Sequence, residues 1–199
     1  FLKAPSGAFF MVFCMNFPLL RTFDVSNSIT LFLEKILIQY VNQVGWTNYE
    51  LKNCFDKNKG YLTDNLLEWD DEKFKNFTQN ELLDLISSHL ETDKSKLSYT
   101  WIHFLSYENG GSMERHKHWH NEDFVLFIYL KTCSSGRTIF YLNDFIEEHA
   151  KRTPVAILPK KNLAAIFSSM ILHEGELCND SDNKQIFVVG VKVNHSNKI

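Results

Sequence analysis

The stretch LAAIFSSMILH, residues 163–173, is an apolar run of small and branched residues that ends in a histidine. Its length and composition predict a buried β-strand. A buried imidazole without a partner is unfavourable, so His173 is expected to ligate a metal, with a hydrogen bond to a backbone carbonyl as the alternative.

A second stretch, RHKHWHNE at residues 115–122, supplies further imidazoles. Residues i and i+2 of a strand point to the same side, so His116 and His118 can present both rings to one point. Imidazoles grouped in this way suit Fe(II), Zn(II), Ni(II) or Mn(II). An exposed strand with a cationic cluster is the alternative for this segment alone. Taken with residues 163–173, it predicts a metal centre formed by His116, His118 and His173.

The second half of the chain reads as strands. Short apolar runs are separated by the turn sequences NGG at 109–111, SSG at 134–136 and NDSDN at 179–183. Aromatic residues on these runs are expected to pack in the core, or to line a dry pocket: Phe104, Phe127, Tyr129 and Phe140. The predicted strands are Leu97–Tyr107, Met113–His118, Asp123–Lys131, Arg137–Leu142, Val155–Leu158, Leu163–His173 and Gln185–Val193.

The first half of the chain carries helical signals. Apolar residues recur at helical spacing from Ile29 to Val44, with Ser26 or Ser28 as the cap and Gly45 at the end. A second helix is expected to begin at Thr78, where TQNE has the form of a capping box. The polar stretch 48–71 is predicted to be loop with one short strand.

These patterns predict a single α+β domain over residues 1–199. Residues 1–96 would form a mainly helical support and residues 97–193 a β-core, with the helices packed outside a sandwich or barrel. The apolar segment 7–20 is too short to span a bilayer and is expected to be a first strand or an extended start.

The composition limits the classes of function. The net charge is -3 with no basic block, so no nucleic-acid patch is visible, and no membrane partner is expected. The four cysteines form no CxxC pair, which favours reduced thiols and a cytoplasmic protein. No GxSxG motif surrounds Ser168 or Ser169, so a hydrolytic nucleophile is not expected.

The order of these motifs resembles the Fe(II)/2-oxoglutarate-dependent oxygenases, in particular the small prolyl-hydroxylase-like group that often has HxH where others have HxD. The resemblance covers residues 97–193, and more loosely the two front helices. It implies a double-stranded β-helix, a jelly-roll or cupin-like barrel. The matching motifs are Tyr107-x2-Gly110-x5-His116-x-His118, Ser135-Gly136-Arg-Thr-Ile-Phe140, Phe167-Ser-Ser-x3-His173 and Lys184.

The resemblance also implies roles for single residues. His116 and His173 would be metal ligands, and His118 stands where the family usually has an aspartate ligand. Lys184, eleven residues beyond His173, would pair with the C5 carboxylate of 2-oxoglutarate in place of the usual arginine. Tyr107 would add a hydroxyl contact to that carboxylate, and Lys131 is a rival anchor.

The implied function is that of an Fe(II)- and 2-oxoglutarate-dependent dioxygenase, a hydroxylase with O2 and 2-oxoglutarate as co-substrates. Its substrate is unidentified, with a peptide or a small metabolite favoured, and its oligomeric state is left open. One alternative is a cupin-type lyase or dioxygenase that uses His116, His118, Glu122 and His173 without 2-oxoglutarate. Another is a non-catalytic barrel that binds a partner.

Overall fold

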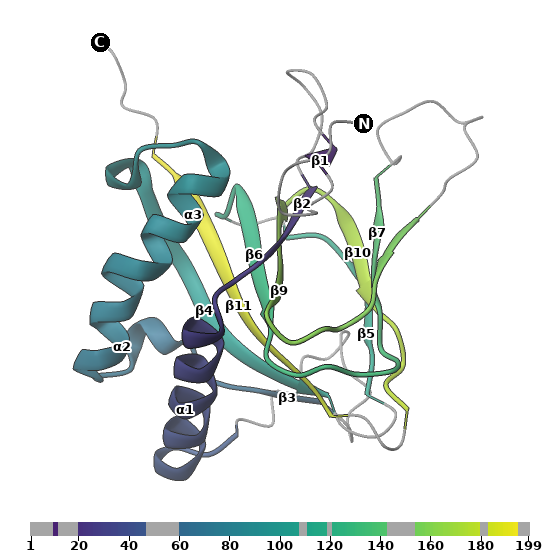
Figure 1. Ribbon diagram of the computed structural model, residues 1–199, viewed down its shortest axis with the longest axis horizontal. Helices are drawn as coiled ribbons and strands as arrows, with labels where there is room; N and C mark the ends of the chain where they lie inside the picture. Colours follow the sequence, from purple (N-terminus) through teal and green to yellow (C-terminus); the bar gives the residue numbers. More distant parts are fainter. Residues whose placement is uncertain are drawn as a thin grey trace.

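The computed structural model describes residues 10–11, 20–46, 60–107, 111–118, 121–142, 154–179 and 183–194. Their strands form two antiparallel sheets (Figure 1). The large sheet has the order β1 (Phe10–Met11), β2 (Leu20–Asp24), β9 (Leu163–Ser168), β6 (Phe124–Tyr129), β11 (Lys184–Val193), β4 (Leu97–Tyr107) and β3 (Gly60–Leu62). The small sheet has the order β5 (Met113–His116), β10 (Leu172–Gly175), β7 (Thr138–Tyr141) and β8 (Val155–Ile157).

The helices lie on one side of the large sheet, and the small sheet lies on the other (Figure 1). Helix α1 (Asn27–Gln43) begins at Ser26, whose hydroxyl accepts a hydrogen bond from the amide of Ile29. The other helical segments are the 3-10 turn η1 (Leu66–Glu68), α2 (Glu72–Phe77), the π-helical turn η2 (Thr78–Leu82), α3 (Leu83–Leu90) and the 3-10 turn η3 (Lys94–Lys96).

Because the large sheet is covered on both faces, its central strands bury both sets of alternating side chains. On β4, Phe104 packs toward the helices, whereas Leu105 and Tyr107 belong to the core between the sheets. The same alternation holds on β6, where Leu126 faces the helices and Phe127 faces the small sheet. The sheet therefore separates a structural core from an inner space between the two sheets.

The predicted α+β double-stranded β-helix with helices outside is confirmed, although among the described residues the two sheets remain separate and do not close into one barrel. The strand Leu97–Tyr107 is reproduced with the same bounds, and most other predicted strands are shortened by one to three residues at their ends. In the first segment, Phe10–Met11 and Leu20–Asp24 are strands, and the residues between them lie outside the described part.

The single strand predicted for residues 163–173 is wrong. The chain leaves the large sheet after Ser168, turns, and enters the small sheet at Leu172. The amide of Ile171 donates to the carbonyl of Ser168 at 3.0 Å, and the amide of Ser169 donates to the carbonyl of Asp123 at 3.0 Å. Backbone hydrogen bonds thus turn the chain at residues 168–171, although the side chains there continue the apolar pattern of a single strand.

The helix predicted to begin at Thr78 starts earlier. Asp71 caps α2 by accepting a hydrogen bond from the amide of Phe74 at 2.8 Å. Thr78 lies inside the continuous helical segment, and its hydroxyl donates to the carbonyl of Lys75 instead of capping a new helix. An aspartate seven residues upstream therefore takes the role that the sequence pattern assigned to Thr78.

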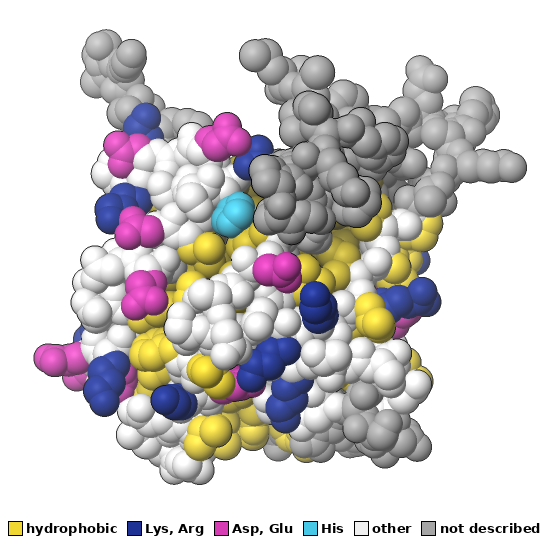
Figure 2. Space-filling view, viewed as in Figure 1, with side chains coloured by type: hydrophobic (Ala, Val, Ile, Leu, Met, Phe, Trp, Pro, Cys, Tyr) yellow, Lys and Arg dark blue, Asp and Glu magenta, His cyan; other side chains and the backbone are white. Residues whose placement is uncertain are grey.

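Charged side chains of both signs are interspersed over the helical side of the face shown in Figure 2. Among the described residues, no helix has the length and apolar character needed to cross a membrane.

Gly190 controls the packing of β11 against β4. It pairs with Trp101 next to an irregularity in the register, and a Cβ atom at Gly190 would lie 2.4 Å from Oγ1 of Thr100 and 2.5 Å from the Trp101 indole. Gly190→Ala is therefore expected to lower the free energy of unfolding by about 1–3 kcal/mol, as overpacking does. Urea unfolding measures this, with Gly175→Ala as the control because its nearest contact would be 3.4 Å. Equal stability of the two variants would contradict the expectation.

Candidate metal centre

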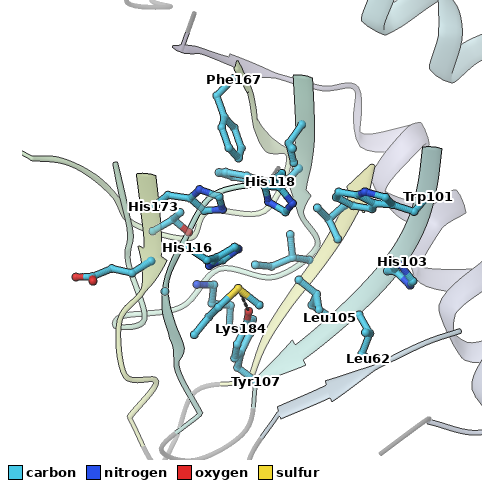
Figure 3. A pocket seen from close by; sticks show the side chains of 18 of the residues that line it. Leu62, Trp101, His103, Leu105, Tyr107, His116, His118, Phe167, His173 and Lys184 are labelled. Carbon is cyan, nitrogen blue, oxygen red and sulfur yellow. Dashed lines mark hydrogen bonds between the residues drawn. The ribbon is translucent and has the colours of Figure 1, made fainter. Parts of the chain in front are cut away.

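Two neighbouring strands of the small sheet bring His116 and His173 together. β5 and β10 are antiparallel, and His116 is paired with His173 in their register. The ring centroids lie 4.2 Å apart, and the side chains point into the space between the sheets (Figure 3). The corner after Ser168 is what places His173 on β10, opposite β5.

His118 joins this pair by a different route from the one predicted. β5 ends at His116, so strand alternation does not align His118 with it. Instead, the amide of His118 donates to the carbonyl of Ser169 at 3.0 Å, which ties the residue to the corner. Its ring centroid lies 5.1 Å from each of the other two. One potential ligand atom from each of the three histidines lies within 4.8 Å of the others.

The surroundings of the rings fix which nitrogen carries hydrogen. Nδ1 of His116 lies 2.8 Å from the carbonyl of Glu114, and Nδ1 of His173 lies 2.9 Å from the carbonyl of Ile171. Since a carbonyl oxygen only accepts, both Nδ1 atoms must donate, which leaves each Nε2 with a free lone pair. This is the tautomer that a metal-binding histidine needs when it ligates through Nε2.

Burial keeps these imidazoles neutral. It lowers the pKa of His116, and it lowers the pKa of His173 well below its ordinary value, with further lowering from His116 and His118. Metal ligation requires the neutral imidazole, so no proton has to be removed from His116 or His173 before a divalent ion binds. The donor set of three imidazoles fits Fe(II), Zn(II), Ni(II) or Mn(II).

The histidines lie in the wall of a cavity of about 760 Å³ between the sheets. This volume is within the usual range for small-molecule sites. Apolar side chains from β4, β6, β9 and β11 form much of its remaining wall, among them Leu105, Val125, Phe127, Phe167, Ile186 and Val188.

Lys184 is a buried cation in the same cavity (Figure 3). Its Nζ donates to the carbonyl of Gly136 at 2.7 Å and lies 5.0 Å from the centre of the Tyr107 ring. Burial lowers the pKa of Lys184 to about 8, against the opposing influence of Cys178, Cys133 and Glu176. A buried ammonium held by one carbonyl and an aromatic face is suited to receive an anion from the cavity.

The other two candidate residues lie in different settings. Tyr107 lines the cavity, and its hydroxyl donates to Sδ of Met113 at 3.6 Å. Lys131 is exposed, just after β6, and is not among the residues that line the cavity. The structure thus brings Lys184 and Tyr107 to the histidines and leaves Lys131 outside.

Among the lining residues that were not anticipated from the sequence are two aromatic side chains. Trp101 and His103 precede Leu105 and Tyr107 on the same face of β4. The Trp101 ring stacks on His118 with centroids 5.4 Å apart, and Nδ1 of His103 lies 3.0 Å from the carbonyl of Thr63. The alternation along β4 was the signal that could have identified them.

The fold and the histidine cluster define a double-stranded β-helix with a candidate metal centre between its sheets. No protein-family model matches the sequence, and no curated protein matches it. Solved structures do match. A prolyl-4-hydroxylase from Pseudomonas putida is 12% identical, with a TM-score of 0.64 over 88% of this chain and 93% of that one.

Two further structures show the same likeness. A prolyl hydroxylase from Trichoplax adhaerens, solved with a hypoxia inducible factor peptide fragment, is 14% identical, with a TM-score of 0.62 over 87% of this chain and 83% of that one. HygX from Streptomyces hygroscopicus, solved with nickel and 2-oxoglutarate bound, is 7% identical, with a TM-score of 0.65 over 87% of this chain and 82% of that one. At these identities the likeness establishes the fold.

Removal of one imidazole tests the metal centre. His116→Ala and His173→Ala are each expected to lower the affinity for Fe(II) or Ni(II) by more than the roughly 10- to 100-fold typical of losing an outer hydrogen-bond partner, because a direct ligand is lost. Metal content after dialysis against a weak chelator measures the effect. His103→Ala is the control, since His103 lines the cavity outside the cluster. Retention of metal by both cluster variants would rule the site out.

Proposed function

We propose that this chain is a non-haem Fe(II)- and 2-oxoglutarate-dependent dioxygenase that hydroxylates its substrate. One observation carries the proposal: a buried cation, Lys184, lies in the wall of the same cavity as the cluster of His116, His118 and His173. A metal-binding group and an anion-binding group in one cavity suit a metal with a dicarboxylate co-substrate. The fold shared with the matched structures supports the same assignment.

The three histidines would hold Fe(II), which with 2-oxoglutarate and O2 supplies the oxidation of a C–H bond as 2-oxoglutarate becomes succinate and CO2. The protein's own task is to bind, orient and exclude water. Apolar side chains such as Leu105, Phe127 and Phe167 line the cavity and would limit the access of water to the bound groups. Burial against apolar side chains strengthens the interaction of a charged group with its ligand.

Lys184 would pair with the C5 carboxylate of 2-oxoglutarate. Its Nζ is oriented by the carbonyl of Gly136, and a Cβ at Gly175 would come within 3.5 Å of it, so the small residue there leaves space beside the ammonium. A lysine acts on a carboxylate as a point charge, without the paired hydrogen bonds of an arginine. The hydroxyl of Tyr107 would make a second contact to the same carboxylate.

The substrate would enter on the side of Trp101 and His103. These residues line the cavity together with Asp64 and Glu68, which are exposed, so this wall continues to the protein surface. An opening of this kind admits a peptide segment or a small metabolite. The peptide fragment bound to the Trichoplax adhaerens enzyme supports the first. A cytoplasmic setting fits the buried thiol of Cys178, which would stay reduced there.

The geometry favours this function over a cupin enzyme with Glu122 as fourth ligand. The group of potential ligand atoms within 4.8 Å of one another contains the three histidines and does not extend to Glu122. The Glu122 carboxylate lies instead beside Nδ1 of His118, at 3.5 Å. A cupin of this kind would also leave the buried charge of Lys184 without a role.

Replacing each candidate lysine tests the function. Lys184→Met is expected to abolish both the rise in melting temperature with 2-oxoglutarate and the metal-dependent formation of succinate, because the cation for the C5 carboxylate is removed. Lys131→Met is the matched control and is expected to behave as wild type. Wild-type protein with bound metal that neither binds 2-oxoglutarate nor forms succinate would refute the function. If Lys131→Met lost 2-oxoglutarate binding and Lys184→Met kept it, Lys131 would be the residue that binds the C5 carboxylate.

The binding of 2-oxoglutarate is expected to depend on pH through Lys184. The free protein has a pKa of about 8 at this group, and a bound carboxylate stabilises the ammonium and raises that pKa. Affinity is therefore constant below about pH 8 and falls by roughly tenfold per pH unit above it, until the pKa of the complex is reached. Calorimetric titration between pH 7 and 9.5 measures this. A constant Kd over that range would contradict the role of Lys184, and Lys131→Met should keep the wild-type profile.

A further inference from the structure

The buried carboxylate of Glu122 lies beside the His118 ring, one of the three histidines of the cluster. The Glu122 side chain is 3% exposed, and its Oε1 lies 3.5 Å from Nδ1 of His118. Its Oε2 accepts a hydrogen bond from the amide of Asn121 at 3.1 Å. Burial of a carboxylate is unfavourable unless hydrogen-bond donors or cations surround it, so the imidazole is part of what holds this charge.

The three histidines differ in this respect. His116 and His173 each have a neutral backbone carbonyl at Nδ1, from Glu114 and Ile171. His118 has a carboxylate at the same nitrogen. A carboxylate behind a metal-binding imidazole orients the ring and makes its other nitrogen a stronger donor. The cluster therefore has one ligand with an anionic partner and two with neutral partners.

We propose that Glu122 is a positioning residue that makes His118 the strongest donor of the cluster and supplies the negative charge that three neutral imidazoles lack. The inference rests on the metal centre of the proposed function. Nδ1 of His118 directs its hydrogen to Glu122, and Nε2 turns to the cluster. The carboxylate thus acts through the imidazole and does not touch the metal.

The surroundings hold this arrangement from three sides. The amide of His118 donates to the carbonyl of Ser169, which fixes the backbone. The Trp101 ring covers one face of the imidazole, at an interplanar angle of 29°. The amide of Asn121 holds the oxygen of Glu122 that does not face His118. Two of these contacts to His118 come from distant segments, the corner at Ser169 and strand β4, and both restrict the orientation of its ring.

The test is the affinity of the full chain for Co(II), measured with a competing chelator, together with the visible ligand-field spectrum of the cobalt protein. Glu122→Gln removes the charge at nearly constant shape, and we expect a Kd raised about 10- to 100-fold with shifted bands. Glu114→Gln is the matched control: its side chain is exposed, and only its backbone carbonyl contacts the cluster. It should leave both readouts unchanged.

Glu122→Asp is the second variant, and it also serves if Glu122→Gln fails to fold. It keeps the charge but withdraws it from Nδ1, so its Kd should lie above that of wild type and below that of Glu122→Gln. The proposal would be overturned if Glu122→Gln kept the wild-type Co(II) affinity and spectrum, or if Glu122→Asp kept the wild-type affinity. It would also be overturned if both variants lost Co(II) affinity to the same extent. The last result would assign Glu122 to packing.

These outcomes are separable from failure of the dioxygenase function. Weaker cobalt binding in Glu122→Gln supports the positioning role even where wild-type protein forms no succinate from 2-oxoglutarate. Succinate formation by the wild type together with unchanged cobalt binding in Glu122→Gln overturns the positioning role and leaves the dioxygenase intact.

Discussion

The backbone of Ser169 joins the two segments that carry the histidines. Its amide donates to the carbonyl of Asp123, and its carbonyl accepts from the amide of His118. The adjacent turn, closed by Ser168 and Ile171, carries the chain from the large sheet to the small one. Ser169 itself is 4% exposed, and buried backbone groups of this kind must be paired. These backbone hydrogen bonds therefore position His118 and His173 relative to each other.

The large sheet isolates this corner from the part of the molecule that provides stability. Its outer face packs on the helices through residues such as Phe104 and Phe187, and its inner face forms the cavity wall. Side chains facing the cavity can be polar or charged without interrupting the outer core. Two of them, His173 and Lys184, are buried groups that a purely stabilising design would replace with apolar residues. Their presence in the cavity wall, His173 on the small sheet and Lys184 on the large one, is what links the fold to a function.

Short, mainly apolar runs bounded by turn sequences made β4, β6 and β11 predictable. The corner at residues 168–171 was not predictable in the same way, since LAAIFSSMILH reads as one apolar strand and the turn is made by backbone hydrogen bonds. The start of α2 was missed for a related reason. Asp71 and TQNE at 78–81 both have the chemistry of an N-cap, but in the structure Asp71 begins the helix and the Thr78 hydroxyl donates to the carbonyl of Lys75.

At the site, too, the sequence indicates which residue types are present but not which way their side chains point. Spacing could nominate Lys184 and Lys131 equally, because both lie at strand ends, and burial separates them. Glu122 is the sharper case. Its position four residues after His118 is consistent with a direct ligand, yet its carboxylate lies on the Nδ1 side of that imidazole. Sequence spacing states which groups can meet but does not state which nitrogen of a histidine faces the metal. That direction decides whether a carboxylate binds an ion or strengthens the ligand that does.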